Sequence, residues 1–304
     1  MGFFFSAMPA VIIFSLLSLL AAGGGDFIFR RAQLKSAAEG GMRAEDYLVI
    51  HSTFFSILAL IYVQWASGLV LEVRVLPLVI PTSVASFLSL YLVIRSLRLG
   101  SVSTNISIYR LNFIITSLLG ILILSEAATA RKFLGLAFGF GAVAFFAVAE
   151  MRFAGQSARG SGSSGGGAGA RPFLLAGAGM LLQAIFHFLM KYYLSRGISL
   201  YSFIPPHVVL FNAYVYASAF GRGNFRLTRP MKAHSPVSGL LYGSAFIFLL
   251  LALRAGEASI VAPISQLSFV FSALLAMGFL RESLGGFRLA GLLMAVAAVL
   301  ALSR

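Results

Sequence analysis

Two stretches of this chain carry the same residues at the same spacing, and both lie in almost unbroken apolar sequence. Residues 97–135 align without a gap to residues 253–291, which lie 156 positions further on. The recurring residues are, in the first stretch, Leu97, Arg98, Gly100, Ser103, Ile108, Leu111, Phe113, Leu118, Leu119, Leu124, Glu126 and Gly135. Two related membrane units around a central site are typical of secondary transporters. The repeat therefore predicts two similar halves and favours transport.

Ten segments are long and apolar enough to cross a bilayer, which takes about 20 residues. Hydrophobic residues make up 59% of the chain and charged residues 11%, against about 25% charged residues in soluble domains. The ten segments are Met8–Phe29, Tyr47–Leu69, Val75–Ile94, Ser101–Leu124, Phe133–Met151, Pro172–Met190, Leu200–Phe220, Val237–Leu253, Ala258–Leu280 and Phe287–Leu302. We predict an all-α, multi-pass integral membrane protein, of the plasma or inner membrane if the chain is prokaryotic.

The predicted helices divide into two units of five. Residues 1–151 form the first unit, residues 172–304 form the second, and residues 152–171 form a Gly- and Ser-rich linker of flexible composition. Asp26-Phe-Ile-Phe-Arg-Arg also resembles His187-Phe-Leu-Met-Lys-Tyr, so the first helices of the two units match as well. Because five is an odd number, the second unit enters the membrane from the opposite side. The units therefore form an inverted repeat of ten transmembrane helices.

The charges and motifs argue against several other classes of protein. The net charge is +14, but the 23 Lys and Arg residues lie almost entirely in short connections. This placement indicates membrane topology and lipid headgroup contact rather than nucleic-acid binding. The sequence contains no Cys, no HExxH and no P-loop, so we expect neither an enzyme nor a bound metal or cofactor.

The repeated stretches also resemble a known family. Gly256-Glu-Ala-Ser-Ile-Val-Ala-Pro-Ile-Ser-Gln-Leu-Ser-Phe-Val, followed by Leu280-Arg-Glu282, is similar to the second EamA domain of the drug/metabolite transporter superfamily, and Gly100-Ser-Val-Ser through Leu124-Ser-Glu126 to the first. The resemblance implies a ten-helix carrier with a central cavity, which exports or exchanges small metabolites by alternating access. It also implies cytoplasmic termini. The resemblance does not identify the substrate, because the Lys-Arg pair found in helix 9 of triose-phosphate translocators is absent from this chain.

The basic residues alone predict the opposite orientation. Seven Lys or Arg residues lie in connections on the side of the termini and fifteen on the other side, which by the positive-inside rule places the termini outside. Residues such as Arg30 and Arg98 belong to a cavity rather than to a loop if they point inward. We therefore expect the cytoplasmic termini that the resemblance implies.

Arg110 is the clearest candidate for substrate binding. It lies ten residues into its predicted helix, which places it ~15 Å deep in a ~30 Å hydrocarbon layer. A charge at that depth costs at least about 2.5 kcal/mol, so it is expected to face a cavity or a partner. Ser103 and Ser107 share its helical face, and its repeat mate is Gln266. We predict that the guanidinium binds a carboxylate, phosphate or other anion.

Other polar residues in the same helices have two interpretations each. Tyr109 and Asn112 form a second polar face, and Ser265 is the repeat mate of Tyr109; such residues line a cavity or hydrogen-bond neighbouring helices. Asp26 and His187 occupy equivalent places in the two halves and are candidates for carrying a coupling proton.

The alternative for each of these groups is structural. Asp26 can pair with Arg30 one turn away or with Arg110, and His187 can bond a neighbouring helix. If Arg110 instead lies in a site with few acids, the site has a positive potential. It then favours a small polar metabolite that is anionic or zwitterionic. The alternatives are an exporter of cationic drugs, a channel or a non-transporting membrane protein.

Three further features predict structural roles. Glu126 and Glu282 end equivalent helices, and we expect them to cap the following helix or to pair with a nearby arginine. Pro263 predicts a hinge in its helix. Gly135 and Gly139 form a GxxxG pattern, which indicates close helix packing within the chain or in a homodimer.

Overall fold

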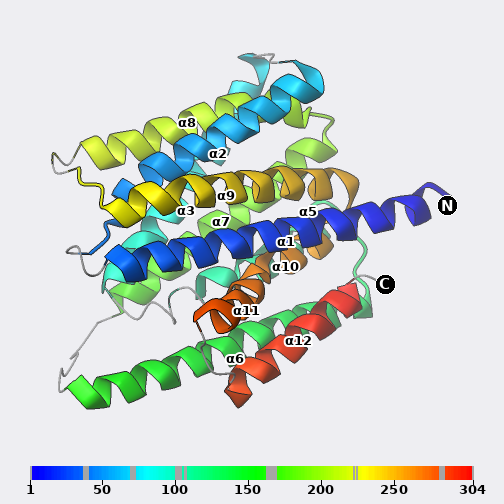
Figure 1. Cartoon of the computed structure of the whole chain (residues 1–304). Helices are drawn as coiled ribbons and strands as arrows, with labels where there is room; N and C mark the ends of the chain where they lie inside the picture. The colour runs from blue at the N-terminus through cyan, green and yellow to red at the C-terminus, as the bar shows by residue number, and fades with distance from the viewer. Residues whose placement is uncertain are drawn as a thin grey trace.

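The computed structural model describes residues 2–36, 41–68, 73–99, 105, 108–161, 170–221, 223, 225–280 and 285–302, and its regular elements there are all helical. The helices lie alongside one another in an elongated bundle (Figure 1). They are α1 (Gly2–Ser36), α2 (Ala44–Ser67), the 3-10 turn η2 (Val73–Val75), α3 (Leu76–Leu99), α5 (Asn112–Ile123), α6 (Ala130–Ser161), α7 (Arg171–Ser195), α8 (Leu200–Phe220), α9 (Arg229–Ala255), α10 (Ala258–Gln266), α11 (Ser268–Leu280) and α12 (Gly286–Leu302).

Six helical segments in the described residues are long and apolar enough to cross a membrane. They are Ala10–Ser36, Glu45–Ser67, Leu76–Ser96, Arg171–Ser195, Arg229–Ala255 and Ala258–Phe279. Large apolar side chains remain on the outside of the bundle, with Trp65 84% and Phe279 71% exposed. A surface of this kind is unfavourable in water but suits contact with lipid. The all-α prediction is confirmed for the described residues, and these six segments are compatible with an integral membrane protein.

The helix packing keeps its pattern when the helices of one half are exchanged for those of the other. α1 packs on α9 as α7 packs on α3, α2 packs on α9 as α8 packs on α3, and α1 packs on α10 and α11 as α7 packs on α5. Of the remaining large contacts, those of α2 with α8 and of α6 with α12 join helices that correspond to each other, and a further one joins α5 to α10. In Figure 1, α2 and α8 lie along one edge of the bundle and α6 and α12 along the opposite edge.

One pair of side-chain contacts repeats this exchange at the level of single residues. Ser18 Oγ donates to the carbonyl oxygen of Ala245 at 2.9 Å. Ser89 Oγ donates to the carbonyl oxygen of Gly179, also at 2.9 Å. Gly179 lies at the position that corresponds to Ser18 in the other half, and Ser89 at the position that corresponds to Ala245. The same close approach between two helices therefore occurs twice.

The ends of the helices show their directions. Ser36 Oγ lies 2.9 Å from Thr228 Oγ1, and the amide of Arg226 donates to Asp46 Oδ2 at 3.3 Å. The end of α1 and the starts of α2 and α9 therefore meet at one end of the bundle. The corresponding helices α2 and α8 run in opposite directions, whereas α1 starts and α12 ends at the same end (Figure 1).

The GxxxG pattern in α6 is used within the chain. A Cβ on Gly139 would lie 3.1 Å from the ring of Phe113, and one on Gly135 would lie 2.5 Å from the side chain of Leu302. The two glycines therefore let α5 and α12 approach the same face of α6. This favours the first of the two interpretations, close packing within the chain.

Candidate binding site at two facing helix breaks

Two helices are interrupted at positions that the repeat relates. Leu111 separates a short helical stretch, residues 108–110, from α5, and Leu267 separates α10 from α11. At each break the amide bonds to the carbonyl three residues earlier, to Ile108 at 3.1 Å and to Ile264 at 3.2 Å. This is the tighter 3-10 pattern, which in the middle of a helix often marks a functional position. Because Leu111 and Leu267 are repeat mates, both halves contain the same interruption.

Pro263 does not itself interrupt its helix. α10 continues through it, and the break follows four residues later at Leu267. Proline removes one hydrogen bond from the preceding turn and weakens the helix there. The predicted hinge and the observed break thus lie one turn apart.

Arg110 and Gln266 immediately precede the two breaks, and their side chains meet. Arg110 Nη1 lies 3.5 Å from Gln266 Oε1 and donates to Ser268 Oγ at 2.8 Å. Arg110 Nη2 forms an ion pair with Asp26 Oδ2. The side chains of Arg110 and Asp26 are 15% and 21% exposed. The pair is therefore not sealed within the protein.

A run of three glycines before Asp26 lets α1 approach this site. A Cβ on Gly25 would lie 2.6 Å from the ring of Tyr242, and a Cβ on Gly23 would clash with the carbonyl oxygen of Ser268. The close approach allows the hydroxyl of Tyr242 to donate to Asp26 Oδ1. Both oxygens of the Asp26 carboxylate thus have a partner, one on α9 and one beside the α5 break.

Asn112 continues the polar network on the other side of Arg110. Its side-chain amide donates to the carbonyl oxygen of Tyr109 at 2.8 Å and lies 3.4 Å from Gln266 Oε1. Arg110, Asn112 and their repeat mates Gln266 and Ser268 therefore form one cluster. The two helix breaks face each other across it.

The network then extends to α3 and α7. Ser89 Oγ lies 3.4 Å from the hydroxyl of Tyr109 and 3.0 Å from Gln183 Oε1, and Gln183 Nε2 lies 3.0 Å from His187 Nε2. His187, which occupies the place in its half that Asp26 occupies in the other, therefore lies at the end of a chain of polar contacts that starts at the hydroxyl of Tyr109.

Among the described residues, three contacts join a residue to its own repeat mate. Arg110 contacts Gln266, as described, and Asn212 donates to Ser56. The rings of Phe55 and Phe211 lie 6.2 Å apart. Each pair is separated by 156 positions. These contacts between repeat mates lie at the site and between α2 and α8.

The same offset pairs two histidines that sequence reasoning missed. His51 Nδ1 lies 2.8 Å from Ser238 Oγ, and His207 Nδ1 lies 2.9 Å from Ser83 Oγ. The signal was present, because His51 and His207 are also 156 positions apart. The repeat therefore extends into α2 and α8, beyond the stretch where its sequence is strongest.

Three predicted residues remain. Ser103 and Ser107 are outside the described residues. Ser265 is buried, and its hydroxyl has no hydrogen-bond partner in the described part of the chain. Few acids lie near Arg110 in the sequence, but the fold brings Asp26 to it, and this ion pair, one of the structural alternatives, offsets its charge.

The structure adds residues that the sequence did not single out. Tyr242 and Ser89 come from segments with no distinctive pattern. Gln183 was recognisable, because it is an amide within an apolar segment and lies one helical turn before His187. It is this turn that connects His187 to the network.

Comparisons with known proteins support the fold. No protein-family model matches the chain, and no curated protein matches it. Among solved structures 28 chains match. One of them, described as "Crystal structure of protein", has a TM-score of 0.76 and 12% sequence identity, covering 96% of this chain and 96% of that chain. At this identity the likeness shows the fold alone: an all-helical chain whose described residues include six segments long and apolar enough to cross a membrane.

Proposed function

We propose that this chain is a secondary transporter of the EamA type, in the drug/metabolite transporter superfamily, and that it carries a small polar metabolite by alternating access. The observation that carries the proposal is the meeting of two helix breaks, one from each half, around the partly exposed Asp26–Arg110 pair. Broken helices that meet near the middle of the membrane are how many transporters build their substrate and ion sites.

The proposal includes ten transmembrane helices in two inverted five-helix units. The packing pattern that survives exchange of the halves supports this arrangement. The opposite directions of α2 and α8, together with the contacts between repeat mates, support an axis in the membrane plane (Figure 1). Two units related in this way can exchange their conformations, which opens the site to one side and then to the other.

The Asp26–Arg110 pair bears on the substrate. A ligand carboxylate or phosphate that binds Nη2 of Arg110 replaces Asp26 there, and an unpaired carboxylate is unfavourable within the membrane. Asp26 then needs a new positive partner. In a zwitterion the ammonium group supplies it, and for a simple anion a coupling proton does. The site thus favours anionic or zwitterionic metabolites and gives Asp26 a reason to take up a proton.

A ligand screen followed by flux measurements tests the proposal. Detergent-purified protein is heated with small anions, zwitterions and organic cations. A ligand that binds the folded state raises the midpoint of thermal unfolding, and the rise grows with the logarithm of the ligand concentration. The best ligand is then followed into proteoliposomes. We expect saturable uptake of an anion or zwitterion whose affinity falls at least tenfold in Arg110→Gln and less in Arg110→Lys, which keeps the charge but lacks the planar fork of donors.

The matched control is Ser244→Ala, which removes a hydroxyl that bonds only its own helix, to the carbonyl of Leu240 at 3.0 Å. It is expected to transport as the wild type does. A flux that does not saturate indicates a channel instead. A best ligand that is a simple cation supports the exporter of cationic drugs and contradicts the proposal.

A further inference from the structure

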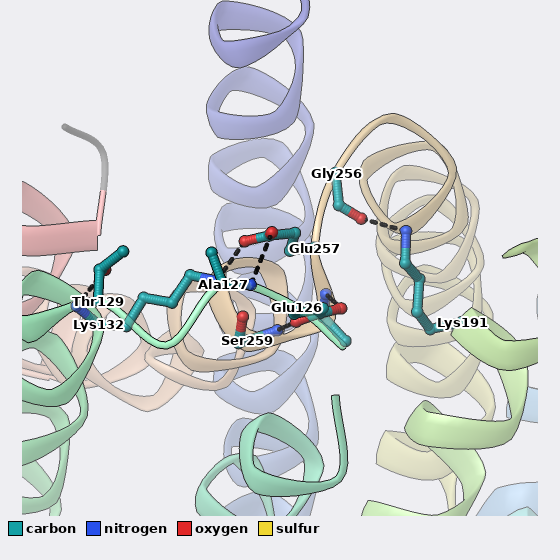
Figure 2. Close-up of polar contacts among 9 residues, drawn as sticks. Glu126, Ala127, Thr129, Lys132, Lys191, Gly256, Glu257 and Ser259 are labelled. Atoms are coloured by element: carbon teal, nitrogen blue, oxygen red, sulfur yellow. Dashed lines mark hydrogen bonds and ion pairs between the residues drawn. The ribbon is translucent and has the colours of Figure 1, made fainter. Parts of the chain in front are cut away.

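A second polar cluster ties the two halves together, far along the bundle from Asp26. It lies at the end where α1 starts and α12 ends, and it joins the connection between α5 and α6 to the connection between α9 and α10 (Figures 1 and 2). Its charged members are Glu126, Lys132, Lys191 and Glu257, and we call this set the terminal-side clamp. The set contains two acids and two bases, so its charges balance.

Glu126 makes the most direct contact between the halves. Its carboxylate accepts the backbone N–H groups of Ala258 at 2.7 Å and Ser259 at 2.9 Å, which are the first two residues of α10 (Figure 2). The first N–H groups of a helix have no partner within it and carry a partial positive charge. Glu126 is therefore a cap, as expected, but the helix that it caps belongs to the other half rather than following it.

The local backbone aims Glu126 at α10. Ser125 adopts a left-handed conformation with φ 55°, and the amide of Glu126 returns to the carbonyl of Gly120 at 3.3 Å. A Cβ on Gly120 would lie 2.8 Å from the Glu126 carboxylate. The glycine therefore leaves the space in which the carboxylate lies, and Glu126 is 8% exposed there.

The other three charges reinforce this contact. Lys132 on α6 forms an ion pair with Glu257, which precedes α10, and the two side chains are 6% and 30% exposed. The amide of Ala127 also lies 3.4 Å from Glu257 Oε1. Lys191 on α7 donates to the carbonyl oxygen of Gly256 at the end of α9 (Figure 2), and also to that of Leu253.

One short helix connects the clamp to the candidate binding site. α10 has nine residues, and at a rise of 1.5 Å per residue its first and last residues lie about 12 Å apart along the axis. Its start is held by Glu126, and its last residue, Gln266, contacts Arg110. Residues 258–265 are all buried. A movement of α10 at either end is therefore transmitted to the other.

We propose that the terminal-side clamp keeps this end of the bundle closed and that it must be released when the binding site opens toward this end. The proposal rests on the proposed transport function. Release leaves the first amides of α10 without an acceptor unless water takes the place of the carboxylate. Opening and hydration of this end are thus the same event, and the charge of Glu126 sets how often it occurs.

Cysteine labelling of the full-length protein tests the clamp without any substrate. The chain has no native Cys, and the buried hydroxyl of Ser259 has no hydrogen-bond partner in the described residues, so Ser259→Cys is a mild change. In proteoliposomes a water-soluble maleimide reports how often this end opens. We expect Glu126→Gln to speed labelling of this cysteine roughly tenfold or more, the effect of losing one charge-assisted contact.

Two further variants separate the clamp from general damage. Gly120→Ala displaces the carboxylate without changing any charge and is expected to speed labelling as well. Thr129→Val lies in the same connection but loses only a local bond to the amide of Lys132 at 3.3 Å, and it is expected to label at the wild-type rate.

A cysteine at Ser235, which is fully buried near the start of α9 at the opposite end, distinguishes opening from unfolding. It is expected to stay protected in Glu126→Gln. The clamp proposal is overturned if the cysteine at position 259 is labelled at the wild-type rate in both Glu126→Gln and Gly120→Ala. It is also overturned if Glu126→Gln speeds labelling of the cysteine at position 235 as much as it speeds labelling at position 259. Either result leaves the transport proposal standing. Faster labelling without saturable flux of any ligand supports the clamp and contradicts transport.

Discussion

The ion pair between Asp26 and Arg110 lends itself to a double-mutant cycle that separates its structural and binding roles. The cycle consists of Asp26→Asn, Arg110→Gln and the double variant. Glutamine is chosen because Gln266 already occupies the corresponding place beside the other helix break. Asparagine keeps an acceptor for the hydroxyl of Tyr242, which donates to Asp26.

The structure sets the size of the expected effect. Breaking a fully buried ion pair from one side costs about 3–5 kcal/mol, because the remaining charge has no partner. Here the side chains are 15% and 21% exposed, and water relieves part of that cost. We expect about 2 kcal/mol for each single variant. We expect only about 1 kcal/mol for the double variant, which contains no orphaned charge. The coupling between the two positions is then about 3 kcal/mol, at the upper end of measured values.

Thermal unfolding in detergent measures these differences. A loss of 2 kcal/mol lowers the midpoint by about 5 °C in a protein of moderate size, so the double variant is expected to melt above both single variants. Ligand binding is measured on the same samples. Both variants that lack Arg110 are expected to bind the selected anion or zwitterion at least tenfold more weakly.

Two results contradict the reasoning. If the double variant is no more stable than the weaker single variant, the two charges do not act as a pair. If the double variant is stable and binds the ligand with wild-type affinity, Arg110 is a structural residue and the proposed site is wrong.

Three further perturbations follow from the structure. The Cβ added by Gly25→Ala would lie 2.6 Å from Tyr242, and we expect this variant to lower the free energy of unfolding by about 1–3 kcal/mol, measured by thermal unfolding. Its control is Gly24→Ala, whose added Cβ makes only ordinary contacts at 3.5 Å. Ser89→Ala removes the hydroxyl that lies 2.9 Å from the carbonyl oxygen of Gly179 and 3.0 Å from Gln183 Oε1. We expect it to lower the free energy of unfolding by about 1 kcal/mol relative to Ser244→Ala, seen as a lower thermal midpoint. A single cysteine at Ser6 is expected to be protected from impermeant maleimide in intact cells, since we place the termini in the cytoplasm, whereas one at Ser163, five predicted helices further on, is expected to be labelled; labelling of the cysteine at Ser6 supports the opposite orientation.

Apolar segments located the helices well, but their ends less so. α9 begins at Arg229 rather than at the predicted Val237, because Thr228 caps it through the amide of Met231 at 3.3 Å and Pro230 stands in its first turn. Both are recognisable start signals. Hydropathy alone places the start of a helix at its first apolar residue, so it does not predict a polar first turn before the apolar segment.

The helix breaks were beyond reach of local sequence. Leucine is a good helix former, so nothing at Leu111 or Leu267 predicts an interruption. The partners of Arg110 were equally hidden, since Asp26 precedes it by 84 positions and Ser268 follows it by 158. Sequence can place a charge at depth within a helix, but the group that compensates it is chosen by the packing of helices far apart in the chain.

The repeat itself contains a signal of the site, and it lies where the two copies differ. Many residues are the same in both copies of the repeat, as Leu111 and Leu267 are. A residue beside the twofold axis faces its own mate, and two arginines at the 3.5 Å that separates Arg110 from Gln266 would repel each other by about 5 kcal/mol at an effective dielectric of 20. A charge on the axis is therefore tolerated in one half only. Asp26 and His187 also differ: the half that contains Arg110 has an acid at this position, and the other half has a histidine. In an inverted repeat, a buried charge that contacts its own neutral repeat mate, as Arg110 contacts Gln266, thus indicates where a central site can form.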